Sequence, residues 1–292
     1  MIVNMENLTI GDLFCRRIPF IIEKYQRDYA WDSTEIEDFI NDIQKLYDTY
    51  DLQNKKSRVK EDPKRKRHFF GGLVSIEKHI SHTTTGRVFE IVDGQQRLAT
   101  FMISISLVVK SLNTISKIAD QKGNKSIKKR AKNNAEQTDE TLIHYIEIEE
   151  DEKVPHLRLQ LSDPDKVFFE NLINESHPTP SRESHNRIIF AYNEIKTKLV
   201  EKTISDDTFS EDTKMKCLLR LLSCLVDNCH VIHIISDDKK DAYRLFTVLN
   251  DRGRALSDGD LLRSFTLELL ESNHKLQSQV ESNWNEILVN GI

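Results

Sequence analysis

Apolar residues along the chain recur first at the spacing of an amphipathic helix. Asp32-Ser-Thr-Glu35 has the form of a capping box. Behind it, apolar residues repeat at i, i+3, i+4, i+7 and i+11, namely Ile36, Phe39, Ile40, Ile43 and Tyr47. This spacing predicts a helix over about 33–50. The polar, basic stretch 51–67 that follows has no periodicity and predicts an exposed loop.

Two short segments rich in β-formers come next. Phe69–Ile76 and Arg87–Val92 flank the polar stretch Ser81–Gly86, which predicts a β-hairpin. The second strand runs straight into Asp93–Arg97, with the sequence Asp-Gly-Gln-Gln-Arg. After that turn the apolar positions cover most sides of a helix and predict that it is buried: Leu98, Phe101, Met102, Ile105, Leu107, Val108 and Val109.

The remainder of the chain predicts mainly helices. A lysine-rich stretch that ends near Lys132 interrupts the periodicity, and we divide the chain into regions 1–115 and 116–292. In the second region 214–228 predicts a helix and Val231–Ile235 a short buried strand. A further helix is predicted by apolar residues at helical spacing, Ala242, Leu245, Phe246 and Leu249. The glycine of Asn250-Asp251-Arg252-Gly253 would stop this helix, and Ser257–Asp260 would start the next one.

Composition narrows the class of protein. Of 292 residues, 38% are hydrophobic and 30% charged, and only 9 Gly and 6 Pro leave few turn points, which excludes an all-β fold and favours α+β. The pattern contains neither a signal-peptide flank nor about 18 consecutive apolar residues, so we expect a cytoplasmic protein that contacts no membrane.

Charge and cysteine distribution refine this picture. The net charge of −5 hides a basic block over Lys55–Arg67 and an acidic one over Glu136–Glu152. The cysteines form no Cys-x-x-Cys pair, so we expect small core residues rather than zinc ligands or disulfides at Cys15, Cys217, Cys224 and Cys229. His230 and His233 lie three apart on a predicted strand, so they point to opposite faces and do not share a metal.

The turn Asp93–Arg97 is the first candidate site. A helix N-terminus offers unpaired N–H groups and a positive dipole end to phosphate, Gly94 permits close approach, and Arg97 adds a fork of donors. Asp93 could hold a metal ion, and Gln95 or Gln96 could position a water for attack on phosphorus. The alternative is structural, because Asp93 and Gln96 three residues on also have capping-box spacing.

Two further clusters are candidates. Tyr25–Trp31 interleaves aromatic residues with Gln26 and Arg27, which suits stacking a base and gripping its phosphates. The alternative is that Tyr29 and Trp31 only fix the helix entry to the core. Asn250–Gly253 could close over a ligand, although the same pattern is also ordinary helix-stop chemistry.

Taken in order, these segments share one pattern: Ile21–Trp31, Phe70–Val74, Ile91–Thr100, and Phe246–Gly253 with Leu256-Ser257. The pattern resembles the GmrS-like N-terminal domain of GmrSD-type modification-dependent restriction systems, over nearly the whole chain. This chain departs from the family at Glu23, where proline is usual, and at Ala99, where threonine is common. Neither change removes a charged or phosphate-facing group.

The resemblance implies a ParB/sulfiredoxin-like α/β N-terminal region followed by a mainly helical region. It also implies NTP binding and hydrolysis with Mg²⁺ or another divalent cation, in a sensor and regulatory module of an anti-phage restriction system. Asp93, Gln95, Gln96 and Arg97 would be catalytic, with Asp93 also the metal ligand. The nucleotide would be bound by a larger set of residues: Tyr25, Gln26, Arg27, Gly94, Asn250, Arg252 and Gly253.

The partners implied are a nucleoside triphosphate, modified DNA and an HNH nuclease, which would follow as a C-terminal domain beyond residue 292 or belong to a partner subunit. A homo-oligomer is a further expectation. The DNA contacts would come from the basic block, at Lys64, Arg65, Lys66 and Arg67, unless that block serves only solubility. Two alternatives remain open: a ParB-like nucleotide-gated DNA-binding module without turnover, and an interaction subunit with vestigial motifs.

Overall fold

The computed structural model describes residues 2–16, 18–23, 26–56, 67–79, 86–149, 152–174, 176–242, 275–276, 278–280 and 283. Its strands are β1 (Ile2–Thr9), β2 (Phe20–Ile21), β3 (His68–His79), β4 (Arg87–Asp93), β5 (His144–Glu149), β6 (Glu152–Leu157), β7 (Leu159–Gln160) and β8 (Cys229–Ser236). Its α-helices are α1 (Ile10–Cys15), α2 (Ser33–Lys56), α3 (Gln95–Gln121), α4 (Lys125–Thr138), α5 (Asp163–Ile173), α6 (Glu183–Glu194) and α7 (Glu211–Asp227). Two π-helical segments, η1 (Asp139–Ile143) and η2 (Ile195–Glu201), complete the order.

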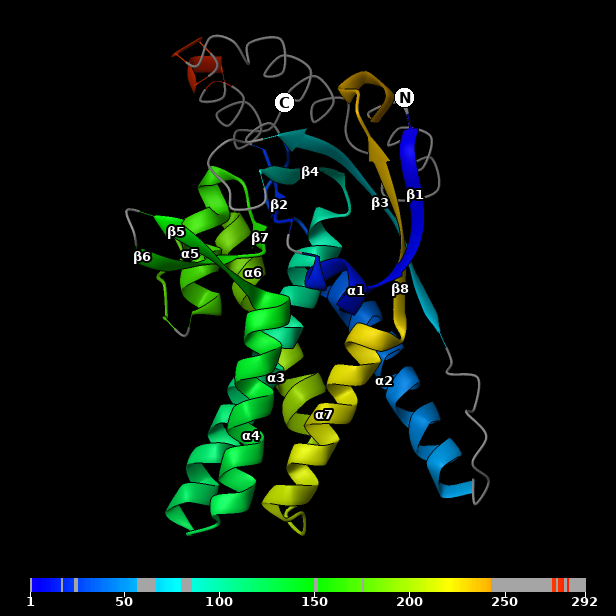
Figure 1. Cartoon of the computed structure of the whole chain (residues 1–292), viewed down its shortest axis with the longest axis vertical. Coiled ribbons are helices and arrows are strands. Elements are labelled where there is room, and N and C mark those ends of the chain that lie inside the picture. The colour runs from blue at the N-terminus through cyan, green and yellow to red at the C-terminus, as the bar shows by residue number, and fades with distance from the viewer. Residues whose placement is uncertain are drawn as a thin grey trace.

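Six strands form one mixed sheet in the order β1-β8-β3-β4-β2-β7. The predicted hairpin is confirmed, because β3 and β4 pair antiparallel, whereas β3 pairs parallel with β8. Alternation along β3 directs Leu73 into the main hydrophobic cluster and Val74 and Ile76 into a smaller one. The fold is therefore α+β, and Figure 1 shows α2, α3, α4 and α7 extending below the strands.

The predicted buried helix is α3, and it is the centre of the molecule. Most of its residues from Gln95 to Val109 are buried. It is long and apolar enough to span a membrane, with a mean hydropathy of 1.6 over 18 residues, yet 78% of that window is buried inside the protein. Since its apolar surface packs against protein on nearly every side, α3 is a core helix.

The predicted capping box of α2 is confirmed, but the helix is longer than expected. The Asp32 N–H donates to Glu35 Oε2 at 2.9 Å, and the Thr34 N–H donates to Asp32 Oδ1 at 3.0 Å. The helix continues to Lys56, so the prediction of a loop is wrong for 51–56. Leu, Gln and Lys in this stretch have good helix propensity, which sustains the helix without an apolar stripe. Residues 57–66 lie outside the described part of the chain.

The lysine-rich stretch, at which we place the boundary between the two regions, is helical. It forms α4, whose Ala131 and Ala135 are buried against the core while its lysines face outward. The proposed boundary at 115/116 falls inside α3, and one hydrophobic cluster contains residues from both sides of it, such as Phe101 and Leu218. The division into two functional regions stays a prediction.

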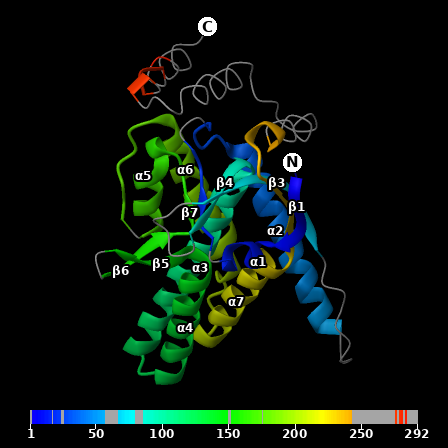
Figure 2. The same cartoon turned by 45° about the horizontal axis from the view of Figure 1, so that its top comes forward.

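The later predicted strand and helix are present, one hairpin was not predicted, and the prediction for the cysteines holds only in part. The strand at 231–235 and the helix at 214–228 are confirmed as β8 and α7. An unforeseen two-stranded hairpin, β5–β6, begins within the acidic block and extends past it, and Figure 2 shows it beside the helices and apart from the main sheet. All four cysteines are free. Cys224 and Cys229 are buried as expected, whereas Cys15 is exposed because it ends the short α1 at the surface.

Candidate functional site

The Asp93–Arg97 turn lies where β4 passes into α3. Gly94 is the residue before the helix and has φ +100°, a left-handed conformation that favours glycine. A Cβ atom there would stand 2.8 Å from Leu73 Cδ1. The backbone conformation therefore favours glycine at this position, and a Cβ atom would also displace the end of the Leu73 side chain.

The capping-box alternative for this turn is wrong. No side chain caps α3 within the described residues, and its first backbone bond runs from the Leu98 N–H to Gly94 O at 3.1 Å. The Gln96 side chain bonds elsewhere. The amides of the first turn are therefore left without a side-chain acceptor, which is the condition under which a helix N-terminus binds an anion.

Arg97 lies beside this turn and is held by two acceptors. Its Nη1 donates to Phe70 O at 2.7 Å, and its Nη2 donates to Asp93 Oδ2 at 3.2 Å. The two side chains of the pair are 21% and 17% exposed, so both reach solvent. A Cβ atom on Gly71 (φ +95°) would lie 2.4 Å from Arg97 Nη1, which shows that this glycine makes the room for the guanidinium.

Both glutamines of the turn bind the backbone of the predicted nucleotide-binding cluster. Gln95 Nε2 donates to Arg27 O at 3.0 Å. Gln96 Nε2 donates to Asp28 O at 3.1 Å, and Gln96 Oε1 accepts from the Ala30 N–H at 2.8 Å. Three hydrogen bonds thus join residues that are 66 or 68 positions apart in sequence. The predicted role of Gln95 and Gln96 in positioning a nucleophile stays a prediction.

The structural alternative for Tyr29 and Trp31, that they fix the helix entry to the core, is confirmed. Tyr29 is 4% exposed and its hydroxyl is 2.8 Å from Thr100 Oγ1, one turn along α3 from Gln96. Burial raises the pKa of this phenol, which keeps it neutral. Trp31 packs against the main cluster next to Phe39.

Sequence reasoning missed Asp165, a buried carboxylate on α5. It is 1% exposed and accepts from the Tyr29 N–H at 3.0 Å and from Ser184 Oγ at 2.5 Å. The signal in the sequence is slight, an aspartate at the start of an apolar helix, which ordinary helix-terminus chemistry also produces. With Arg27, Gln95 and Gln96, Asp165 lines a recess of about 10 Å³, which has room for about one water molecule.

Several predicted residues lie outside the described part of the chain: Tyr25, Asn250, Arg252, Gly253, Lys64, Arg65 and Lys66. Arg67 is described and exposed, just before β3. Gln26 is 8% exposed, and its N–H donates to Glu23 O at 3.0 Å. The structure thus brings residues 27–30 to Gln95 and Gln96 through the hydrogen bonds of the two glutamine side chains. Residues 250–253 lie outside the described part of the chain.

A metal ion would find few protein ligands at this turn. No group of three or more His, Cys, Asp or Glu residues that could hold a metal occurs within the described residues. Asp93 supplies one carboxylate, which fits Mg²⁺, since that ion is commonly held by one or two carboxylates and completed by substrate phosphates and water. The residues therefore fit a cation that arrives with a nucleotide.

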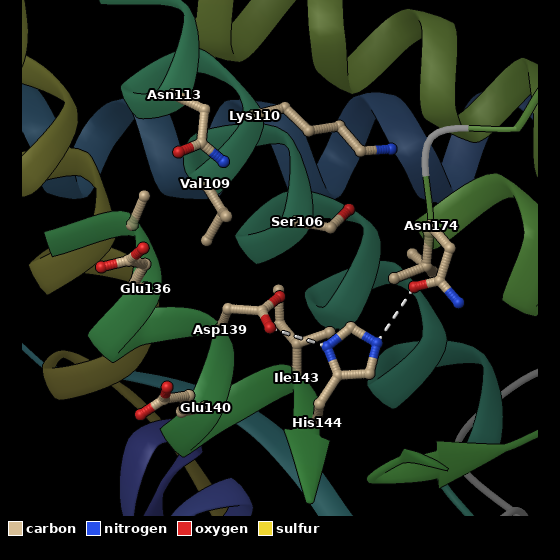
Figure 3. A pocket seen from close by; sticks show the side chains of 12 residues that line it. Ser106, Val109, Lys110, Asn113, Glu136, Asp139, Glu140, Ile143, His144 and Asn174 are labelled. Carbon is tan, nitrogen blue, oxygen red and sulfur yellow. Dashed lines mark hydrogen bonds and ion pairs between the residues drawn. The ribbon is translucent and has the colours of Figure 1, made fainter. Parts of the chain in front are cut away.

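A larger cavity of about 370 Å³ lies farther along α3, against η1 (Figure 3). There His144 Nδ1 is 2.9 Å from Asp139 Oδ2, and His144 Nε2 is 3.0 Å from Asn174 Oδ1. Burial by itself lowers the pKa of His144. The hydrogen bond and charge of Asp139, together with the hydrogen bond of Asn174, outweigh burial, so the net effect is a raised pKa. Nothing in the sequence pattern predicted this cavity.

A comparison with known protein families gives a match over most of the chain. A search of curated proteins gives no significant match. The family model of the GmrSD restriction endonuclease N-terminal domain matches residues 10–267, which include every element from α1 to β8. The chain therefore belongs to the family of GmrSD restriction endonuclease N-terminal domains.

Proposed function

We propose that this chain is the NTP-binding and NTP-hydrolysing sensor of an anti-phage restriction system. Family membership makes it a component of such a system, with DNA as substrate and a nuclease as partner domain. The observation that carries the nucleotide proposal is the first turn of α3, where amides without a side-chain cap adjoin Gly94 and Arg97. That combination is the chemistry of a phosphate site.

The Asp93–Arg97 pair would exchange partners when nucleotide binds. In the structure the guanidinium neutralises the carboxylate. Phosphate oxygens would take over the donors of Arg97, whose side chain is 21% exposed, and would accept from the first-turn amides, which have no side-chain cap. Bound Mg²⁺ would offset the negative charge of the phosphates, with Asp93 as its protein ligand. Gln95 Oε1 would orient the attacking water, while Gln96 would hold the 26–31 segment.

Recognition of modified DNA and control of an HNH nuclease belong to the same proposal. The basic residues Lys64 to Arg67 would contact DNA phosphates, which predicts that affinity for DNA falls steeply with salt. Binding of modified DNA would then be coupled to nucleotide turnover.

Thermal shift with ATP, GTP, CTP and UTP, each with Mg²⁺, tests nucleotide binding. A nucleotide present at 100 times its Kd stabilises the folded state by about 2.7 kcal/mol. We expect one or more NTPs to raise the Tm of the wild type and not of Arg97→Ala. The matched control is Arg130→Ala, which removes an exposed arginine paired with Asp212 on distant helices.

Phosphate release separates the enzyme from its nearest alternative. An NTPase releases phosphate in the presence of Mg²⁺, and modified DNA changes the rate. A ParB-like nucleotide-gated DNA-binding module shows the Tm shift without steady release. If no NTP raised the Tm of the wild type, the result would favour the remaining alternative, an interaction subunit with vestigial motifs.

A further inference from the structure

The 26–31 segment, which carries the predicted nucleotide-binding residues Gln26 and Arg27, is held from two sides. On one side it meets α3, through the bonds of Gln95 and Gln96 already described. On the other side it meets α5 and α6, which come more than 130 residues later in the chain. The position of the 26–31 segment is thus set jointly by α3 on one side and by α5 and α6 on the other.

Asp165 makes the central contact on the second side. Its Oδ2 accepts the Tyr29 N–H at 3.0 Å, and its Oδ1 accepts Ser184 Oγ at 2.5 Å, with His185 Nε2 at 3.5 Å. A carboxylate that is 1% exposed is costly to bury unless such donors surround it. Hydrogen bonds to an ionised acceptor are roughly twice as strong as neutral ones, so this contact is a strong restraint.

Other contacts from α6 act on the same segment. Arg187 Nη1 donates to Ala30 O at 3.3 Å, and Arg182 Nη1 is 3.7 Å from Asp28 Oδ2. Both are long and partly exposed, which makes them weak. Asp165 is therefore the residue through which the α5–α6 pair principally fixes Tyr29.

We infer that Asp165 is a positioning residue for the nucleotide site: by holding the Tyr29 N–H from α5, it fixes Gln26 and Arg27 against the first turn of α3. This inference rests on the proposed function and adds a route of regulation to it. A displacement of α5 and α6 would release Tyr29 and change nucleotide affinity without contact at the phosphates.

The test compares Asp165→Ala, Asp165→Asn and Ile173→Val in the full chain. The alanine variant leaves the Tyr29 N–H without its acceptor. In the asparagine variant, Oδ1 can still accept from Tyr29 and the amide can face Ser184, whose hydroxyl also accepts, so it is the conservative rescue. Ile173 is buried on the same helix and makes the matched control for loss of core packing.

Calorimetric titration with ATP, GTP, CTP and UTP in the presence of Mg²⁺ measures Kd well below the Tm of each variant, and hydrogen exchange measures opening of 26–31. Loss of a charge-assisted bond corresponds to roughly a tenfold change in an equilibrium constant. We expect the Kd of Asp165→Ala to rise about tenfold and exchange at 26–31 to increase, with Asp165→Asn between it and the wild type. Ile173→Val should change neither.

A purely structural role would lower the Tm of Asp165→Ala while Kd and the exchange at 26–31 stayed at wild-type values, and that result overturns the inference. If Asp165→Ala does not fold, Ser184→Ala replaces it, because it removes the hydroxyl that orients the carboxylate; an unchanged Kd in both Ser184→Ala and Asp165→Asn would then overturn the inference. A wild type that binds none of the four nucleotides overturns the proposed function as well, which distinguishes the two failures.

Discussion

At the scale of single residues, Gly71 and Arg97 are complementary. The guanidinium lies where a side chain on residue 71 would stand, and it reaches Asp93 from there. Gly71 has no side chain, so its polar atoms are those of the backbone alone. Its contribution is space at a left-handed position, next to the group that we propose binds phosphate.

Gly71→Ala should therefore weaken nucleotide binding in addition to the loss of stability that a side chain at a left-handed position causes. A left-handed non-glycine residue costs roughly 1–2 kcal/mol, and the displaced atom is the end of a flexible side chain, so the protein should fold with Arg97 swung aside. The control is Gly123→Ala at φ +71°, where nothing lies within 4 Å of the added Cβ. Urea unfolding should show similar losses for both variants, and Kd should change for Gly71→Ala alone. Equal Kd values would contradict a role for Arg97 at the phosphates.

His144 predicts a pH-dependent contribution to stability. Its pKa is raised above 6.5 in the folded protein, so its protonated form is favoured there. The contribution to the free energy of unfolding is complete below pH 6.5 and is lost as pH rises through the raised pKa. His233 has the opposite sign, because burial lowers its pKa to about 4, so only a difference between variants isolates His144.

Urea unfolding from pH 5 to pH 8 measures this difference. His144→Gln should be less stable than the wild type at the acidic end, and the gap should narrow toward pH 8. Asp139→Asn removes the carboxylate partner while His144 still titrates, and it should lose most of the same pH dependence. A gap that stayed constant or grew with pH would show that protonation of His144 is not what the fold favours.

At the scale of elements, α4 shows how composition and packing can point in different directions. Its sequence is mostly polar and rich in lysine, yet Ala131 and Ala135 face α3 and are 0% and 1% exposed. The helix is attached through these two small residues, which permit close approach, and through Ile127, which packs against the main cluster. Ile127 is the one large apolar residue of α4, so a search for an apolar stripe does not find this helix face.

Ala131→Leu tests this packing. Added methylene groups in a filled interface cost typically about 1–3 kcal/mol. Lys132→Ala, one position along and on the exposed face, should stay within about 0.5 kcal/mol of the wild type. Chemical denaturation gives both values. A neutral Ala131→Leu would mean that α4 does not pack on α3 in solution.

At the scale of the whole molecule, α3 joins the two regions of the chain. It begins at the candidate nucleotide site and ends beside α4, and one hydrophobic cluster includes residues of α1, α3, α5 and α7. Because the regions share this core, we do not expect either to unfold without the other.

The expected outcome is a single unfolding transition. Hydrogen exchange measured across a urea series should show protection of β3–β4 and of α6–α7 lost at the same urea concentration, since opening either exposes α3 to water. Two separate midpoints would instead support independent regions divided near 115/116.

The sequence by itself determined the elements whose signals are local. The cap and stripe of α2, the β3–β4 hairpin and the apolar α3 are each encoded within a few residues, and the Asp-Gly-Gln-Gln-Arg turn with its neighbouring motifs indicated the family. Only the tertiary structure decided which atoms these side chains bind. Gln96 bonds the backbone of residues 28 and 30 instead of its own helix end, and Asp165 reaches Tyr29 across 136 positions. The reason is physical: periodicity and capping depend on neighbours in sequence, whereas a buried hydrogen bond depends on which surfaces the packed core brings together.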